Sequence, residues 1–265
     1  HFASMVSTVE AVAREHGYSI LLFNTNDSEA TEAACIQEAV QRWVDGLLVV
    51  QAAGATRTLD ILNAIQTPVV AIDRIPPGFS GNVCRVDNAD ISRIVIHYLY
   101  DLGHRRIAHL PGPHGALPAA DRLAGYRRAL DECGLDYRRV TASDGTWRSD
   151  AGYQAMLELL DNGTLPTAVY ASNDAMAIGA LHALHERGLR VPEDMSVVGV
   201  DDIPICPHLI PALTTVRQPL DVMARAGITM LLDLMNGSSP AERVQTFVPE
   251  LVIRQSTAPP AAVRA

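Results

Sequence analysis

The sequence predicts an α/β fold made of two subdomains, each built on a doubly wound parallel sheet. Short apolar runs alternate with amphipathic segments of helical periodicity almost from end to end, which is typical of parallel sheets covered by helices on both faces. A Pro/Gly-rich stretch, PGPHG at residues 111–115, interrupts this alternation once. With 265 residues, the chain is long enough for two modest cores.

In the first half, residues 5–16 carry apolar side chains at helical spacing, and Gly17 is expected to end that helix. Ser28 is expected to cap a second helix, whose first turn holds Glu29 and Glu32, where the helix dipole favours negative charge. The other predicted helices cover residues 59–65 and 91–102. The predicted strands cover residues 18–23, 47–50, 69–72, 83–86 and 107–110.

The same alternation continues after the Pro/Gly stretch. The predicted helices cover residues 119–133, 150–160, 175–187 and 220–235, and the predicted strands lie near 140 and over 168–171, 196–200, 213–216 and 247–253. We therefore expect a first subdomain of residues 1–110 plus 219–243 and a second of 111–218 plus 244–257. A Pro/Ala-rich tail over 258–265 is expected to fray.

The charge pattern excludes several functions. All 21 basic residues are Arg, so chemistry that needs a lysine amine, such as a Walker-type phosphate loop or a Schiff base, is absent. A net charge of −9 with scattered Arg disfavours direct nucleic-acid binding. The four cysteines stand far apart without a CxxC pair, which favours buried free thiols, no metal and a cytoplasmic location. No apolar run is long enough to span a membrane, and no signal peptide is visible.

Polar residues collect directly after four of the predicted strands, where open parallel sheets bind their ligands. These clusters are Asn24-Thr25-Asn26, Asp73-Arg74, Ser172-Asn173-Asp174 and Asp201-Asp202. Carboxylates, amides and Arg suit the hydroxyls of a polyol, and Trp147 offers a flat apolar face for the C–H surface of a sugar. For each single residue, a turn or helix-cap role is the alternative.

An enzyme is not expected. Asp73, Asp201 and Asp202 could form a glycosidase-like carboxylate pair, but sugar-binding carboxylates explain them equally well. Neither a G-x-S-x-G nor an HExxH motif is present, and no cofactor is expected. His182 and His185 share a helix whose flanking residues favour a packed surface helix over a metal site.

Several segments, in order and spacing, resemble the effector-binding core of the LacI/GalR family of bacterial repressors. They are VDGLLV at residues 44–49, LGHRRIA at 102–108, GP at 112–113, DRLAGY at 121–126, PTAVYASND at 166–174, GLRVPED at 188–194, VGVDD at 198–202 and ALTTVRQP at 212–219. The resemblance runs from His1 to about Ser256. It implies a type I periplasmic-binding-protein-like fold with crossing strands at a hinge, and a small-molecule sensor that regulates operator binding without catalysis.

Carried over position by position, the family's effector contacts fall on ten residues. They are His1, Phe2, Asp73, Arg74, Arg122, Trp147, Tyr170, Asn173, Asp201 and Gln218. Trp147 and Tyr170 correspond to aromatic walls, and Gln218 to a contact on a crossing strand. Arg122, Asn173 and Asp201 correspond to residues that hold sugar hydroxyls. For Arg122 the alternative is an ion pair with Asp121 or Asp201.

The resemblance also sets expectations about partners. The family's DNA-binding headpiece, hinge helix and first core strand would precede His1, so operator DNA is expected to bind only through a headpiece absent from this chain. A homodimer and a sugar or polyol effector are expected, with no membrane partner. Ala116 and Pro118 stand where some members carry polar contacts, so the effector cannot be copied from a relative. The alternative function is a periplasmic sugar-binding protein of a transport system.

Overall fold

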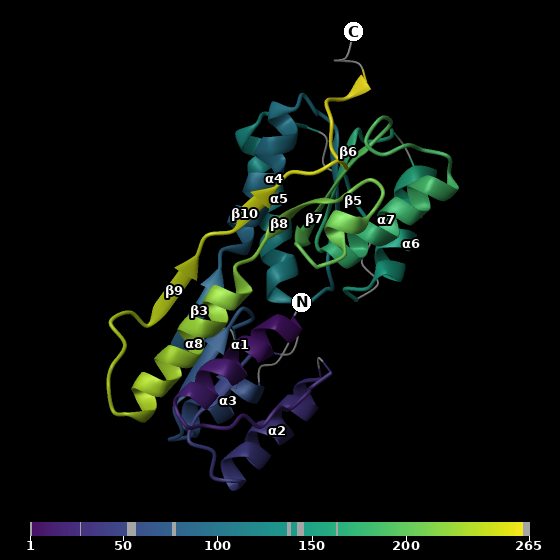
Figure 1. Ribbon diagram of the computed structural model, residues 1–265. Helices are drawn as coiled ribbons and strands as arrows, with labels where there is room; N and C mark the ends of the chain where they lie inside the picture. The colour runs from purple at the N-terminus through teal and green to yellow at the C-terminus, as the bar shows by residue number, and fades with distance from the viewer. Residues whose placement is uncertain are drawn as a thin grey trace. The chain divides into compact units, whose positions relative to one another are not determined.

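The computed structural model describes residues 2–26, 28–51, 57–75, 78–136, 139–141, 146–162 and 164–261. The chain forms two compact units (Figure 1): the first contains residues 1–86 and 219–248, and the second residues 87–218 and 249–265. The predicted boundary at residue 110 is corrected, because strand β4 (Ile107–Leu110) pairs within the sheet of the second unit. The Pro/Gly stretch after β4 is thus a loop at the end of a strand rather than a passage between units.

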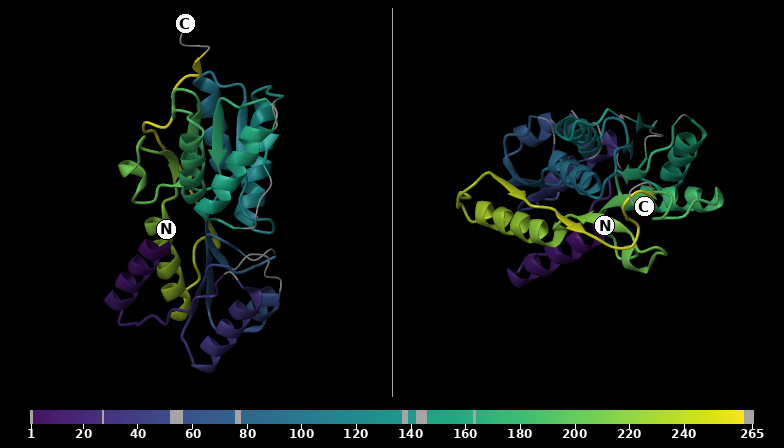
Figure 2. Two further views of the ribbon diagram at one scale, coloured as in Figure 1. Left: turned by 90° about the vertical axis from the view of Figure 1, so that its right-hand side faces the viewer. Right: turned by 90° about the horizontal axis from the view of Figure 1, so that it is seen from above.

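The first unit contains a four-stranded sheet in the order β1-β2-β3-β9, in which every pair is parallel. Its strands are β1 (Leu47–Val49), β2 (Val69–Ile72), β3 (Asn82–Val86) and β9 (Val244–Phe247), and its helices are α1 (Phe2–Glu15), α2 (Glu29–Gln41), α3 (Arg57–Ala64) and α8 (Leu220–Met235). Figure 2 shows α1 and α8 together on one face of the sheet and α2 on the other. Ser28 caps α2 as predicted, because its Oγ accepts the Thr31 N–H at 3.3 Å.

The predicted strand at residues 18–23 is wrong. Residues 18–25 have no regular secondary structure, and Leu21 and Leu22 are 51% and 67% exposed. An apolar run becomes a strand only where a neighbouring strand accepts and donates backbone hydrogen bonds, and no described strand pairs with this segment.

The second unit contains a six-stranded sheet in the order β10-β8-β7-β6-β4-β5, parallel except for the edge strand β10. Its remaining strands are β5 (Arg139–Val140), β6 (Ala168–Ala171), β7 (Ser196–Asp201), β8 (Thr214–Arg217) and β10 (Glu250–Val252). Its helices are α4 (Asn88–Asp101), α5 (Leu117–Glu132), α6 (Ser149–Asp161) and α7 (Asp174–Glu186). The pairs α4–α5 and α6–α7 cover opposite faces (Figure 1).

The sheet forms the core of the second unit. Every residue of β4 and β6, and every residue of β7 except the last, is buried. Near-continuous apolar strands of this kind are expected where helices cover both faces of a parallel sheet. The segment predicted as one strand over 247–253 is instead divided between β9 and β10, and the chain passes from the first unit to the second between them. Ala258, predicted to fray, is held by Ser196 and His104.

None of the helices in the described part of the chain is both long and apolar enough to cross a membrane.

Candidate functional site

The carboxyl ends of β6, β7 and β8 bring together polar side chains from distant parts of the second unit. We name the set Arg122, Trp147, Asn173, Asp201 and Gln218 the carboxyl-edge site. Asn173 follows β6, Asp201 ends β7 and Gln218 follows β8, while Arg122 lies on α5 and Trp147 precedes α6. This edge is where open parallel sheets place their ligands, because the connecting loops there leave room for one.

Arg122 is only 4% exposed, and two neutral groups hold its guanidinium. Its Nε donates to Asn88 Oδ1 at 2.9 Å, and its Nη1 donates to the carbonyl of Ser172 at 2.5 Å. The Nη2 group donates to no residue in the described part of the chain. Neither Asp121 nor Asp201 forms the ion pair that was the alternative for this residue. Arg122 is therefore fixed in place by neutral groups, without a salt bridge to a carboxylate of the described residues, and keeps donors for a ligand.

Trp147 lies beside Arg122, with the guanidinium carbon 5.7 Å from the centre of the indole ring. Its ring packs partly on the core of the second unit and closely over Gly112, where a Cβ would lie 2.5 Å from the indole. Only a glycine leaves room for the ring in this position. Trp147 is half-buried, so the indole can offer apolar surface to a ligand.

Asn173 is a helix cap, the alternative that the sequence left open. Its Oδ1 accepts the Met176 N–H at 2.8 Å at the start of α7. Its Nδ2 donates to the carbonyl of Trp147 at 2.9 Å. The same amide therefore begins a helix and holds the backbone of the aromatic residue, with one N–H of Nδ2 still available.

Asp201 and Gln218 form a polar pair at the ends of β7 and β8. Gln218 Nε2 donates to Asp201 Oδ1 at 2.8 Å, and Gln218 Oε1 is buried without a hydrogen-bond partner among the described residues. Asp201 has a φ of 120°, unusual for a residue with a side chain. Burial raises the pKa of Asp201 to about 6, although Arg122 and the Gln218 hydrogen bond act in the opposite direction.

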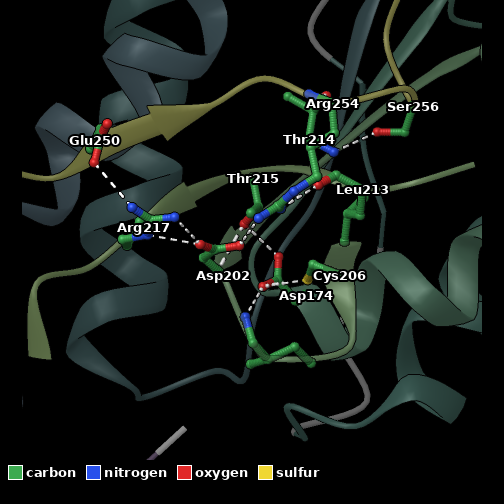
Figure 3. A network of polar contacts seen from close by, with 11 residues as sticks. Asp174, Asp202, Cys206, Leu213, Thr214, Thr215, Arg217, Glu250, Arg254 and Ser256 are labelled. Carbon is green, nitrogen blue, oxygen red and sulfur yellow. Dashed lines mark hydrogen bonds and ion pairs between the residues drawn. The ribbon is translucent and has the colours of Figure 1, made fainter. Parts of the chain in front are cut away.

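The neighbouring carboxylates Asp174 and Asp202 are structural (Figure 3). Asp174 is fully buried and accepts from Thr215 Oγ1 at 2.6 Å, the Ile203 N–H at 2.9 Å and Cys206 Sγ at 3.2 Å. Burial, followed by the nearby charge of Asp201, raises the pKa of Asp174 to about 7.

Asp202 joins two cations. Its carboxylate oxygens pair with Arg217 at 2.7 Å and Arg254 at 2.6 Å, which ties β7 to β8 and to the residues after β10 (Figure 3). Both carboxylates are thus occupied by protein groups, so a glycosidase-like pair involving Asp202 is not formed.

Tyr170 is corrected from a ligand wall to a core residue. Its side chain has no exposed surface, its ring stacks on His109 with centroids 4.6 Å apart, and its hydroxyl lies 3.0 Å from Ser92 Oγ. A ring without exposed surface presents no face to a ligand.

Four predicted site residues belong to the first unit. Asp73 and Arg74 follow β2, where the Asp73 N–H donates to Cys84 O and the Arg74 carbonyl accepts the Gln51 N–H. Asp73 has a φ of 63°. His1 and the side chain of Phe2 lie outside the described residues.

Nothing in the sequence marks Asn88 as a site residue, and although Ser172 stands in one of the predicted polar clusters, its contact with Arg122 is not predicted. Asn88 begins α4 and is 34 residues from Arg122, so no local pattern could have linked them. Within the described residues, no group of three or more His, Cys, Asp or Glu side chains could hold a metal ion. Cys84 and Cys206 are buried free thiols, and Cys35 and Cys133 are partly exposed free thiols.

Known proteins resemble this chain in sequence and architecture. The family model for a periplasmic binding protein-like domain matches residues 96–257. The chain is 33% identical to the HTH-type transcriptional repressor PurR of Pasteurella multocida, over 97% of this chain and 77% of that protein.

The fold is shared with solved structures, among them the following two. A dimeric Lac repressor with a C-terminal deletion superposes with a TM-score of 0.87 and 27% identity, over 97% of this chain and 94% of that one. A LacI family transcriptional regulator from Enterococcus faecium with bound ribose superposes with a TM-score of 0.85 and 27% identity, over the same shares of the two chains.

Proposed function

Because this chain belongs to the LacI/GalR family of bacterial transcriptional repressors and contains their effector-binding core, we propose that it senses a sugar or small polyol at the carboxyl-edge site. The observation that carries the proposal is the state of Arg122. Its guanidinium is buried, held by two neutral acceptors and left with a free Nη2 group beside an indole. A fixed guanidinium that donates no hydrogen bond to a described protein carboxylate is prepared to donate to oxygen atoms of a ligand.

The site combines the three contacts that a sugar ring needs. Arg122 donates to ligand oxygens, and Asp201 accepts from hydroxyl groups. The indole of Trp147 packs against the C–H face of the ring. Asn173 contributes its remaining amide N–H, and Gln218 holds the carboxylate of Asp201 in place. The ribose bound by the regulator from Enterococcus faecium supports the same ligand class.

The proposed output is a change in operator affinity. An effector alters an equilibrium between two protein states only to the extent that it binds one of them more tightly. By linkage, the state that the effector favours then binds operator DNA with a different affinity, through the headpiece that HTH-type relatives carry. We further propose that the protein acts as a homodimer, which the dimeric Lac repressor supports.

A thermal-shift panel of sugars, sugar phosphates, polyols and purines tests the proposal. A ligand at a hundred times its Kd adds about 2.7 kcal/mol of stability, and we expect one sugar or polyol to raise the Tm by several degrees. Arg122→Ala and Asp201→Ala should abolish the shift. Arg187→Ala is the matched control, because Arg187 forms an exposed ion pair with Asp161 on the same unit.

The outcomes separate the parts of the proposal. A purine that shifts the Tm and loses its effect in the same two variants would keep the site but replace the ligand class. A panel in which no compound shifts the Tm would overturn effector binding at this site.

A further inference from the structure

A buried chain of hydrogen bonds connects the loop after β4 to the residue after β6. The Gly112 N–H donates to Ser172 Oγ at 3.0 Å, and Ser172 Oγ lies 3.4 Å from His109 Nε2. On the other side of the imidazole ring, His109 Nδ1 lies 3.0 Å from the carbonyl of Tyr170. Ser172, His109 and Tyr170 have no exposed surface.

The series of hydrogen bonds continues from Tyr170 to Arg122. The Tyr170 hydroxyl lies 3.0 Å from Ser92 Oγ, and Ser92 Oγ donates to the carbonyl of Arg122 at 2.7 Å. Because Arg122 Nη1 donates to the carbonyl of Ser172, the contacts form a closed ring. The ring therefore holds Arg122 at two points, its backbone carbonyl and its guanidinium.

The direction of every hydrogen bond in the ring is fixed. Burial lowers the pKa of His109 to about 3, so the imidazole is neutral and carries a single N–H. The Tyr170 carbonyl can only accept, which places that proton on Nδ1 and leaves Nε2 to accept from the Ser172 hydroxyl. Ser92 donates its one hydroxyl proton to Arg122, so the Tyr170 hydroxyl donates to Ser92.

We propose that His109 and Ser172 are positioning residues for effector binding, which set Arg122 and the indole of Trp147 in the geometry that a ligand meets. This inference rests on the proposed function. Ser172 holds two parts of the site at once, since its hydroxyl fixes Gly112 and its carbonyl fixes Arg122. Gly112 in turn packs against the indole of Trp147, so a movement of the loop after β4 displaces the indole. His109 keeps the Ser172 hydroxyl oriented so that its lone pair faces the Gly112 N–H.

The test uses Trp147 as its reporter. The chain has two tryptophans, and Trp43 is 91% exposed in the first unit, so Trp43→Phe leaves Trp147 as the only indole. Acrylamide quenching of the fluorescence of this single-tryptophan protein then measures the exposure of the Trp147 ring without any ligand.

Two substitutions of His109 separate its two nitrogens. A Gln side chain reaches the position of Nε2 and can accept from Ser172, whereas an Asn side chain reaches only the position of Nδ1, beside the Tyr170 carbonyl. In the Trp43→Phe background we expect His109→Asn to raise the quenching constant, because the Ser172 hydroxyl that holds the Gly112 loop beneath the indole loses its acceptor. We expect His109→Gln to stay close to the parent protein, and Ser172→Ala to behave like His109→Asn.

His104 provides the matched control. It is also buried in the second unit, precedes β4 instead of lying within it, and bonds through both ring nitrogens to Thr167 Oγ1 and the Ala258 carbonyl. His104→Asn should lower the Tm by a similar amount while leaving the quenching of Trp147 unchanged.

A titration with D-ribose adds a functional readout. We expect His109→Asn and Ser172→Ala to weaken ribose binding about tenfold, the effect of one lost hydrogen bond at a site, and His109→Gln to weaken it less. The inference is overturned if His109→Asn lowers the Tm but leaves quenching unchanged, or if His109→Gln and His109→Asn change quenching equally. If ribose fails to bind the parent protein, the ribose part of the proposed function fails, and the quenching comparison still decides the role of His109.

Discussion

Gly125 of α5 packs directly against the backbone of Ala89 in the first turn of α4. A Cβ on Gly125 would lie 2.5 Å from the Ala89 carbonyl oxygen, which is closer than two such atoms approach. Arg122, one helical turn before Gly125, reaches Asn88, one residue before Ala89. The close contact between α4 and α5 therefore sets the distance between Arg122 and Asn88, which form a hydrogen bond across the two helices.

We predict that Gly125→Ala destabilises the protein although alanine favours helices. The propensity gain is about 1 kcal/mol, whereas forcing a methyl group into a packed contact costs about 1–3 kcal/mol and separates the helices. Urea denaturation checks the sign. Ala124→Gly, at an exposed position on the same helix, measures the propensity effect alone. A stabilised Gly125→Ala protein would show that the helices can separate freely.

We predict that sugar binding strengthens as the pH rises through about 6. The pKa of Asp201 is raised to about 6, and only its ionised form accepts hydrogen bonds through both oxygens. At pH 5 about a tenth of this carboxyl is ionised, so binding should be about tenfold weaker than at pH 8. Isothermal titration of the tightest-binding sugar across this range measures the effect. Asp201→Asn should remove the dependence on pH, and a variant that keeps it would assign the titration to another group.

We predict that the free energy of unfolding decreases from pH 5 to pH 7 because of Asp174. The unfolded chain ionises this carboxyl near its ordinary pKa of about 4, whereas the folded state holds the proton until about 7. Between these values the folded state binds more protons, so stability decreases as the pH rises, by up to about 1.4 kcal/mol per pH unit for one proton.

Urea denaturation at several pH values measures that slope. Asp174→Asn should reduce it, with some loss of stability at every pH, because the amide offers one acceptor oxygen for the hydrogen bonds from the Ile203 N–H and Thr215 Oγ1, which Asp174 accepts through two. Asp101→Asn, at an exposed position on α4, is the control and should keep the slope of the parent protein. An unchanged slope in Asp174→Asn would show that this carboxyl is ionised throughout the range.

We predict that Ser256→Ala destabilises the second unit by about 1–3 kcal/mol, the cost of leaving buried polar groups unpaired. Ser256 is fully buried, accepts the Thr214 N–H at 2.8 Å and donates to the Val197 carbonyl at 2.6 Å. Thermal unfolding measures the loss. Ser238→Ala, at an exposed position, should change the Tm very little. Equal effects of the two substitutions would mean that the two hydrogen bonds of the Ser256 hydroxyl contribute little to stability.

The sequence predicts the helices and most strands of this fold because their signals are local. Helix α8 has the predicted bounds, and Ser28 caps α2 through contacts three residues apart. Strand pairing is not local. The division of the last strand into β9 and β10 depends on which strand each meets: β9 pairs with β3 in parallel, whereas β10 pairs with β8 in antiparallel.

In the candidate site, too, local features could be predicted from the sequence and contacts between distant residues could not. The type of residue at each strand end could be predicted, since Asn173, Asp201 and Gln218 directly follow or end apolar runs. The partners of Arg122 could not, because Asn88 and Ser172 are 34 and 50 residues away. Tyr170 is predicted as a ligand contact because it lies in the segment PTAVYASND, which resembles the family's sequence. Its side chain is instead fully buried in the core.

The antiparallel edge strand β10 has a practical consequence for producing the second unit on its own. A continuous gene fragment for residues 87–218 would omit β10, so the backbone of β8 would become an open edge ready to pair with another molecule. It would also omit Arg254, leaving Asp202 with Arg217 alone. A soluble fragment therefore requires residues 249–261 to be fused back by a linker, or a circular permutation that makes the two stretches contiguous.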